Sequence, residues 1–188
     1  NTATPGTNQI IFDFRTTDPQ YAPTIYIDGA TNHLHFSSNG TVLIDTGYSL
    51  TLNTWTHIAV SRASGTTKVF ANGFQIASAS DTTNYTATTT YRLGLSSDSA
   101  YYTGLFSNVR VVKGGALYTS NFTPSTTPLT TTVSSGTVSL LTCQSNRFID
   151  TSSNAFAITV VGSSTTVSRF SSFAGRFFSA FRKPLCGL

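Results

Sequence analysis

The side chains with which proteins usually carry out chemistry are sparse in this sequence. Its seven acidic residues are all Asp, and no two of them lie within four residues of each other along the chain. Hydrolysis of a glycosidic bond needs two carboxyl groups about 5 to 10 Å apart, so a hydrolytic pair could form only across strands. No nucleophile-elbow motif accompanies the three His. We therefore expect no catalytic residues, and a polysaccharide hydrolase is the minor alternative.

Two histidines are candidate metal ligands. His33 and His35 are two residues apart, so on a strand both lie on the same face, where they could supply two zinc ligands and leave a third to come from elsewhere. The simpler interpretation is that both are half-exposed strand residues beside the Asp28–Gly29 turn. We expect no metal and no cofactor, with calcium as an alternative. Oxygen ligands for calcium could come from Asp98, Ser96, Ser97 and Asn84.

Tyrosines gather in the polar stretch from residue 82 to residue 103. An exposed Tyr has an apolar ring and a polar hydroxyl, so beside Asn and Ser it can stack on a sugar and hydrogen-bond to its hydroxyls. The alternative is that these tyrosines line the edge of a sandwich. The glycan-binding residues that we predict are Asn84, Tyr85, Asp98, Tyr101 and Tyr102.

Short strand-like runs, separated by turn residues every eight to twelve positions, must position these side chains. The chain is rich in Thr, Val, Phe and Tyr, which suit a pleated, half-buried surface, and this spacing predicts an all-β, antiparallel β-sandwich. In the long run from Trp55, alternation predicts that Ile58 and Val60 face the core and that Arg62 emerges at the end of the strand. The expected strands are 9–15, 24–28, 33–37, 41–45, 55–63, 68–71, 74–79, 91–95, 105–112, 138–143 and 155–161.

The net charge of +4 comes from the end of the chain. Residues 1–168 carry seven basic and seven acidic groups, so the body lacks the basic stripe of a nucleic-acid-binding protein. No apolar run approaches 18 residues, which argues against membrane insertion. Because the chain opens without Met, we expect a processed or excerpted piece.

The last twenty residues differ from the rest. Phenylalanines recur there at spacings of three, four and four with arginines between them, which is the period of an amphipathic helix that Pro184 would end. We predict that residues 169–188 form an assembly arm that docks on a protein surface; a tail without fixed structure and a membrane-surface helix are the alternatives. The predicted contact residues of the arm are Phe170, Phe173, Phe177, Phe181, Arg176 and Arg182.

Three segments are familiar in combination. They are Asn53-Thr54-Trp55-Thr56-His57-Ile58-Ala59 with Asn72-Gly73, Leu105-Phe106-Ser107-Asn108-Val109-Arg110, and Ser139–Asp150. Together they resemble laminin G-like modules of the concanavalin A-like superfamily, especially those in tail and surface proteins of bacterial viruses.

The resemblance covers about residues 8–168 and implies a jelly-roll, concanavalin A-like sandwich spanning residues 1–168. The opening strands of the family are either missing or supplied by residues 139–162. Ser107 and Asn108 stand where family members often carry acidic residues, which weakens the case for calcium.

The resemblance also implies a function. We expect a non-enzymatic structural or surface protein of a bacteriophage virion, in a fibre or as a decoration, that attaches to host cell-surface glycans. Its partners would be other virion subunits, including copies of itself in a homo-oligomer. The alternative is a purely structural assembly protein that joins subunits through its C-terminal arm and recognises no ligand.

Overall fold

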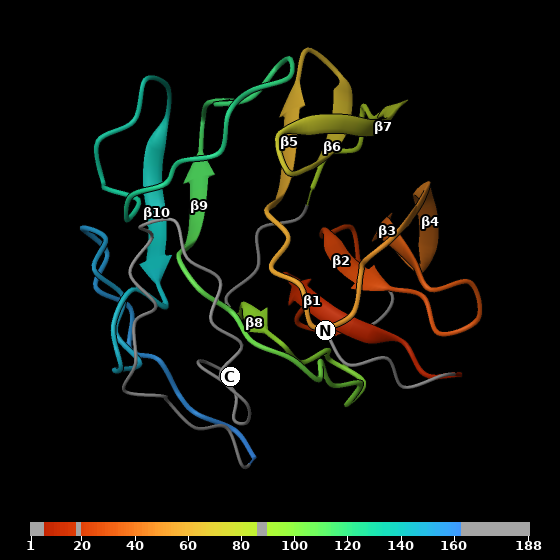
Figure 1. The fold of residues 1–188 in the computed structure, drawn as a ribbon, viewed down its shortest axis with the longest axis horizontal. Helices are drawn as coiled ribbons and strands as arrows, with labels where there is room; N and C mark the ends of the chain where they lie inside the picture. The colour runs from red at the N-terminus through yellow and green to blue at the C-terminus, as the bar shows by residue number, and fades with distance from the viewer. Residues whose placement is uncertain (1–5, 18–19, 86–89, 163–188) are drawn as a thin grey trace. The chain divides into compact units, whose positions relative to one another are not determined.

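The computed structural model describes residues 6–17, 20–85 and 90–162. Within these residues it contains ten β-strands and no helix (Figure 1). All strand pairs in this part of the chain are antiparallel, which confirms the predicted all-β fold. The chain divides into a first unit, residues 1–104 with 118–122, and a second unit, residues 105–117 with 123–188.

The first unit contains a five-stranded sheet with the strand order β4-β3-β2-β1-β8 (Figure 1). Successive hairpins join its first four strands, and β8 adds to the other side of β1. Asn39 and Gly40 turn the chain between β3 and β4 with positive φ at both positions, as a two-residue hairpin requires. In chain order these strands are β1 (Gln9–Asp13), β2 (Thr24–Ile27), β3 (His33–Ser38), β4 (Thr41–Ser49) and β8 (Arg92–Leu93).

A three-stranded sheet in the same unit has the order β5-β6-β7. Its strands are β5 (Ile58–Ala63), β6 (Thr66–Ala71) and β7 (Phe74–Ser80). The alternation predicted along β5 is confirmed, since Ile58 and Val60 pack against the core and Arg62 is exposed. Asn72 and Gly73 form the hairpin turn between β6 and β7, again with positive φ at both positions.

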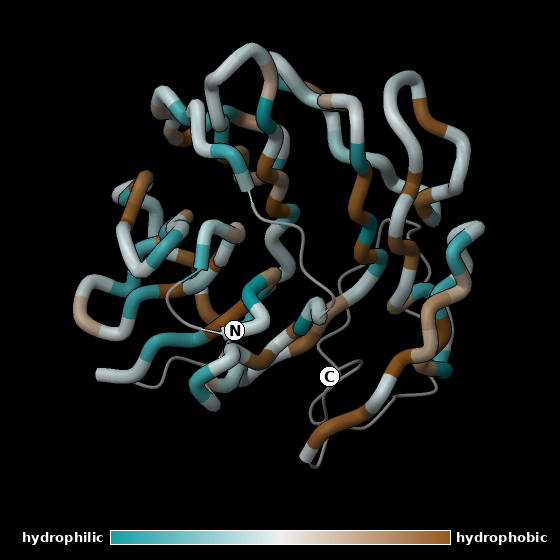
Figure 2. Tube along the Cα trace, turned by 180° about the vertical axis from the view of Figure 1, so that it is seen from behind, coloured by the Kyte–Doolittle hydropathy of each residue, from teal (hydrophilic) through white to brown (hydrophobic). Residues whose placement is uncertain are grey.

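The core of the first unit contains residues from both sheets. Leu34 and Phe36 from β3 are buried in it together with Val69 from β6. Burying each of these side chains contributes about 1.5–3 kcal/mol. Hydrophobic and hydrophilic residues alternate in short stretches along the chain (Figure 2). Because side chains alternate across a strand, His33 and His35 lie on the face of β3 opposite the core.

The second unit contains β9 (Val109–Lys113) and β10 (Thr137–Thr142), which pair with each other. The buried carboxylate of Asp150 organises the segment after β10. Its Oδ1 accepts hydrogen bonds from the backbone N–H of Leu141 at 3.0 Å and of Ser152 at 2.9 Å, and its Oδ2 accepts one from Phe156 at 3.0 Å. The strand predicted over 155–161 is wrong, because this segment makes no sheet ladder and its start is held by a side chain.

Several predictions fall on residues 163–188, which lie outside the described residues. They are the boundary at 168, the helical arm, and the arm residues Phe170, Phe173, Phe177, Phe181, Arg176 and Arg182. Among the residues that are described, no helix is long and apolar enough to cross a membrane.

Candidate functional site

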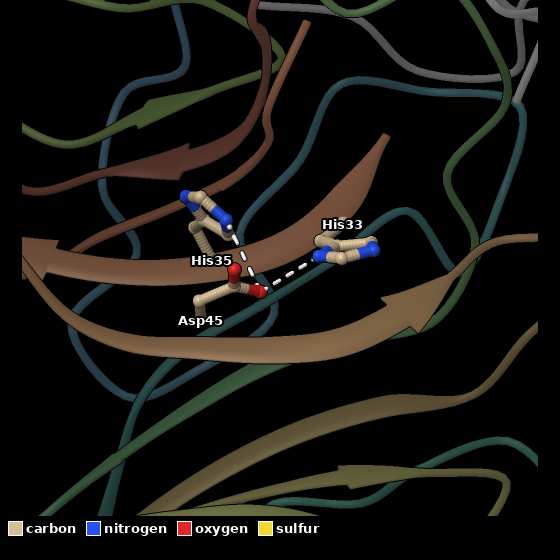
Figure 3. A group of neighbouring side chains, drawn as sticks. All are labelled: His33, His35 and Asp45. Atoms are coloured by element: carbon tan, nitrogen blue, oxygen red, sulfur yellow. Dashed lines mark hydrogen bonds and ion pairs between the residues drawn. The ribbon is translucent and has the colours of Figure 1, made fainter. Parts of the chain in front are cut away.

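His33, His35 and Asp45 form a cluster on the outer face of the five-stranded sheet (Figure 3). The Nδ1 atom of His33 lies 2.9 Å from Oδ1 of Asp45, and Nε2 of His35 lies 3.3 Å from the same oxygen. One donor atom from each side chain lies within 4.8 Å of the others. The prediction that the two histidines share a face is confirmed by this convergence, and Asp45 is the third group that the sequence did not identify.

Two irregularities in the pairing of β3 with β4 flank Asp45: a one-residue shift between Phe36 and Ser37 places it opposite His35, and a bulge in β4 follows it. His35 pairs with Asp45, but His33 pairs with Ser49, so four steps along β4 match two steps along β3. Gly47 sits in the bulge with φ of 64°, a conformation that favours glycine, and its N–H donates to Asp45 Oδ1 at 2.9 Å. This backbone hydrogen bond lowers the pKa of Asp45, and the two imidazoles lower it further. Asp45 is therefore an anion held by its own strand.

Tyr26 of β2 contacts His35 from the side of β3 that lies away from β4. It pairs with His35 across the β2–β3 ladder, and its hydroxyl lies 3.2 Å from Nδ1 of His35. The two rings meet edge to face with centroids 5.2 Å apart. Burial raises the pKa of Tyr26, as do the carboxylates of Asp28 and Asp45, so the phenol stays protonated. These contacts orient His35 so that its Nε2 faces Asp45.

Two of the predicted glycan-binding tyrosines pack against the core of the first unit. Tyr85 and Tyr102 are half-buried there. The hydroxyl of Tyr85 donates to Asp81 Oδ2 at 2.7 Å, and the guanidinium of Arg62 lies 4.8 Å from its ring centroid. Burial and this hydrogen bond raise the pKa of Tyr85, while burial raises the pKa of Tyr102 to about 12. One side of each of these two tyrosine rings is therefore used for packing against the core of the first unit.

The other three predicted glycan-binding residues, Asn84, Asp98 and Tyr101, are exposed. Tyr101 is 55 % exposed and forms an isolated bridge with Leu95. The five residues thus come from two segments, one after β7 and one after β8, and their contact with a glycan stays a prediction.

A buried ion pair lies beside these loops. The carboxylate of Asp13 accepts hydrogen bonds from Nε of Arg15 at 2.9 Å, from Nη2 at 3.0 Å and from the backbone N–H of Ser97 at 2.9 Å. Burial alone would raise the pKa of Asp13, but these hydrogen bonds lower it below its ordinary value. Asp98 lies 3.6 Å from the same guanidinium. The carboxylate suggested for calcium therefore already faces a cation.

Comparison with known proteins identifies the family. A family model described as the concanavalin A-like lectin/glucanases superfamily, of the laminin G type, matches residues 1–121. The chain belongs to this superfamily. No curated protein and no solved structure matches it significantly. The expected laminin G-like, concanavalin A-like fold is confirmed, and the matched range contains both sheets of the first unit.

The Trp-His motif of this concanavalin A-like domain has a structural role. Asn72, in the β6–β7 turn, accepts a hydrogen bond from the N–H of His57 at 2.9 Å and returns one to its carbonyl at 2.8 Å. The His57 ring meets Phe122 edge to face, and Phe122 stacks on Tyr118 at 3.7 Å. The motif therefore fastens the start of β5 to the neighbouring hairpin and to residues 118–122.

The concanavalin A-like domain also exposes aromatic side chains that the sequence did not assign to a site, among them Trp55 and Phe74. Trp55 is 55 % exposed, because the strand expected from residue 55 begins only at Ile58 and Trp55 precedes its paired part. Phe74, the first residue of β7, is 66 % exposed. Its neighbour Gln75 donates its N–H to Asn121 Oδ1 at 2.8 Å. Spacing alone gives no signal that separates these exposed aromatics from core residues.

Proposed function

We propose that this concanavalin A-like domain binds carbohydrate without hydrolysing it. The observation that carries the proposal is membership of a superfamily of lectins and glucanases. The exposed Tyr101, three residues after the exposed Asp98 in the chain, supports it, because an exposed aromatic ring in a polar segment is suited to a sugar face. Trp55 and Phe74 offer further exposed rings in the same unit.

The carboxylates of the described residues support a non-enzymatic role. A glycosidase needs a general acid whose pKa is raised so that it is protonated near neutral pH. Five of these carboxyl groups have a lowered pKa instead, because hydrogen bonds to the charged form outweigh burial. They belong to Asp13, Asp28, Asp45, Asp81 and Asp150.

We place this activity on the surface of a bacteriophage virion, where the module attaches the particle to host cell-surface glycans. The support for this setting is the combined resemblance of the segments around Trp55, Leu105 and Ser139 to modules of tail and surface proteins. Other virion subunits and further copies of the chain are the proposed partners. Many copies on one particle can raise the overall affinity of a weak sugar site by about 10²–10⁴ without new contacts.

A glycan array tests the carbohydrate proposal. The full chain, biotinylated and tetramerised on streptavidin so that weak sites are detected, is applied with and without EDTA. We expect binding to a defined set of microbial glycans, and Tyr101→Ala should reduce that signal at least tenfold. Tyr21→Ala is the matched control, because Tyr21 is a similarly exposed tyrosine outside the predicted residues.

Absence of glycan binding by the multivalent chain would contradict the proposal. Equal binding by wild type and Tyr101→Ala would show that the glycan binds at another surface. The variants Trp55→Ala and Phe74→Ala would then be compared. The structural alternative predicts no glycan binding at all, together with loss of assembly in Phe177→Asp.

A further inference from the structure

We propose that His33, His35 and Asp45 form a binding site for one divalent transition-metal ion, with Zn²⁺ as its simplest representative. The three side chains come from adjacent strands and converge on one point of the outer sheet face (Figure 3). The site shares no residue with the predicted glycan-binding set and does not depend on the proposed carbohydrate activity.

The separations of the donor atoms fit a metal ion. Zinc bonds to histidine nitrogen and carboxylate oxygen at about 2.0–2.2 Å, so ligand atoms in a tetrahedral site lie about 3.3–3.6 Å apart. His35 Nε2 is 3.3 Å from Asp45 Oδ1, and His33 Nδ1 is 2.9 Å from it. The two imidazole nitrogens lie within 4.8 Å of each other, so they would approach by up to about 1.2–1.5 Å when they bind one ion. The partly exposed ring of His33 can turn to make this approach.

The nitrogen of His35 that faces the site has no hydrogen bond. His35 is only 7 % exposed, and its Nε2 is buried without a hydrogen-bond partner, although Asp45 Oδ1 is within ion-pair distance. A buried polar atom without a hydrogen-bond partner lowers the stability of the fold, because it has given up its hydrogen bonds to water. If Nδ1 carries the proton and donates it to the hydroxyl of Tyr26, the lone pair of Nε2 points at a carboxylate, and a cation between the two relieves the repulsion.

The surroundings have the features of a metal site. Metal-binding histidines usually donate their second ring N–H to a neighbouring group that fixes the ring, and Tyr26 stands in that place for His35. The backbone N–H of Gly47 fixes the carboxylate of Asp45 by donating a hydrogen bond to it. Bulges that aim a side chain are frequent beside functional sites. Two of the three proposed ligands, His35 and Asp45, therefore already have neighbours that fix their orientation.

The donor set selects the class of ion. Two imidazoles with one carboxylate suit Zn²⁺ and other late first-row ions, whereas Ca²⁺ and Mg²⁺ prefer sites made of oxygen. His33 and Asp45 are partly exposed. Three protein ligands on an open face leave at least one coordination position for water or an external ligand.

Metal titration of the full chain tests the proposal. The protein is stripped with EDTA, dialysed and titrated with Zn²⁺ by isothermal titration calorimetry. We expect one ion that binds through the cluster, so that Asp45→Asn and His33→Gln each weaken its affinity at least tenfold. Asp98→Asn, which removes an exposed carboxylate outside the cluster, should leave the affinity unchanged.

Histidine ¹⁵N shifts identify the bound atoms. Zinc should move the Nδ1 resonance of His33 and the Nε2 resonance of His35, and it should leave those of His57 in place. Circular dichroism confirms that each variant folds; Asp45 and His33 are partly exposed, so these variants avoid the buried His35.

Three results would overturn the proposal. They are the absence of Zn²⁺ binding, binding of equal strength in wild type and Asp45→Asn, and a preference for Ca²⁺ over Zn²⁺.

Discussion

The buried ion pair between Asp13 and Arg15 offers a sharp test of the packing in the first unit. Asp13→Asn keeps the shape of the side chain and removes its charge. In the native chain the carboxylate accepts hydrogen bonds from two nitrogens of the guanidinium and from the N–H of Ser97. An Asn has only one acceptor oxygen, and its NH₂ group would face other donors.

The expected loss of stability is large, because the Asp13 side chain is completely buried and Arg15 is only 8 % exposed. Removing one partner of a buried ion pair costs about 3–5 kcal/mol, since the other charge stays buried without compensation. For a chain of 188 residues, each kcal/mol lowers the Tm by about 2–4 °C. Asp13→Asn should therefore lower the Tm by roughly 6–20 °C.

Asp98→Asn is the matched control, because Asp98 approaches the same guanidinium from solvent at 3.6 Å. An exposed pair of this kind is worth at most about 1 kcal/mol. Urea unfolding followed by far-UV circular dichroism, with thermal melts of both variants, gives the two free energies. Equal losses in the two variants, or a loss below about 1 kcal/mol in Asp13→Asn, would refute the assignment of a buried, structurally required carboxylate.

Three further predictions test other parts of the fold. The pKa values of Asp81 and Asp150 are lowered in the folded chain, so the unfolded chain takes up protons first as the pH falls and the folded state loses stability. The urea concentration at the midpoint of unfolding should therefore drop as the pH falls from about 5 to 2.5. A rise of the midpoint would contradict the reasoning. Tyr85→Phe removes a hydrogen bond to the Asp81 carboxylate and should cost about 1.5–3 kcal/mol in urea unfolding; no change would show that this bond does not form. Leu34→Ala in the core should cost about 2–5 kcal/mol, whereas Val42→Ala at an exposed position of β4 should stay within about 0.5 kcal/mol; equal effects in thermal melts would contradict the assigned faces.

The hairpins could be predicted from the sequence because their signals are local. Asn39-Gly40 and Asn72-Gly73 tolerate positive φ at both central positions, and each forms a two-residue turn in the structure. Residues 155–161 have the composition of a strand, but no strand among the described residues pairs with them, and the N–H of Phe156 near their start is bonded to the carboxylate of Asp150. Composition cannot reveal whether a strand partner exists.

The position of Asp45 could not be predicted, because it depends on irregular pairing. The turn at Asn39-Gly40 pairs Ser38 with Thr41. If this register continued, Asp45 would lie opposite Leu34 and face the core. A one-residue shift between Phe36 and Ser37 instead places it opposite His35, on the outer face. A slip of one residue reverses the face of every later side chain, and no pattern in the sequence marks this slip.

The sequence also could not show which of the predicted glycan-binding residues are exposed. Tyr85 and Tyr101 lie in equally polar surroundings in the sequence, but the structure packs Tyr85 against the core and leaves Tyr101 exposed. The carboxylate that attracts the hydroxyl of Tyr85 is Asp81, four residues away. Its orientation depends on Thr67 of β6, which also donates to it at 2.6 Å. Contacts of this kind are tertiary and are invisible in the spacing.

The bulge in β4 has a consequence for how copies of the chain can meet. β4 is an edge strand of its sheet, and an uninterrupted edge offers a template on which a strand from another molecule can add, which leads to aggregation. In β4 the N–H of Gly47 is already taken by Asp45, the local pairing is irregular, and a negative charge stands on the edge. The edge is thus protected against strand addition at high local concentration, and an ordered assembly would have to use other surfaces.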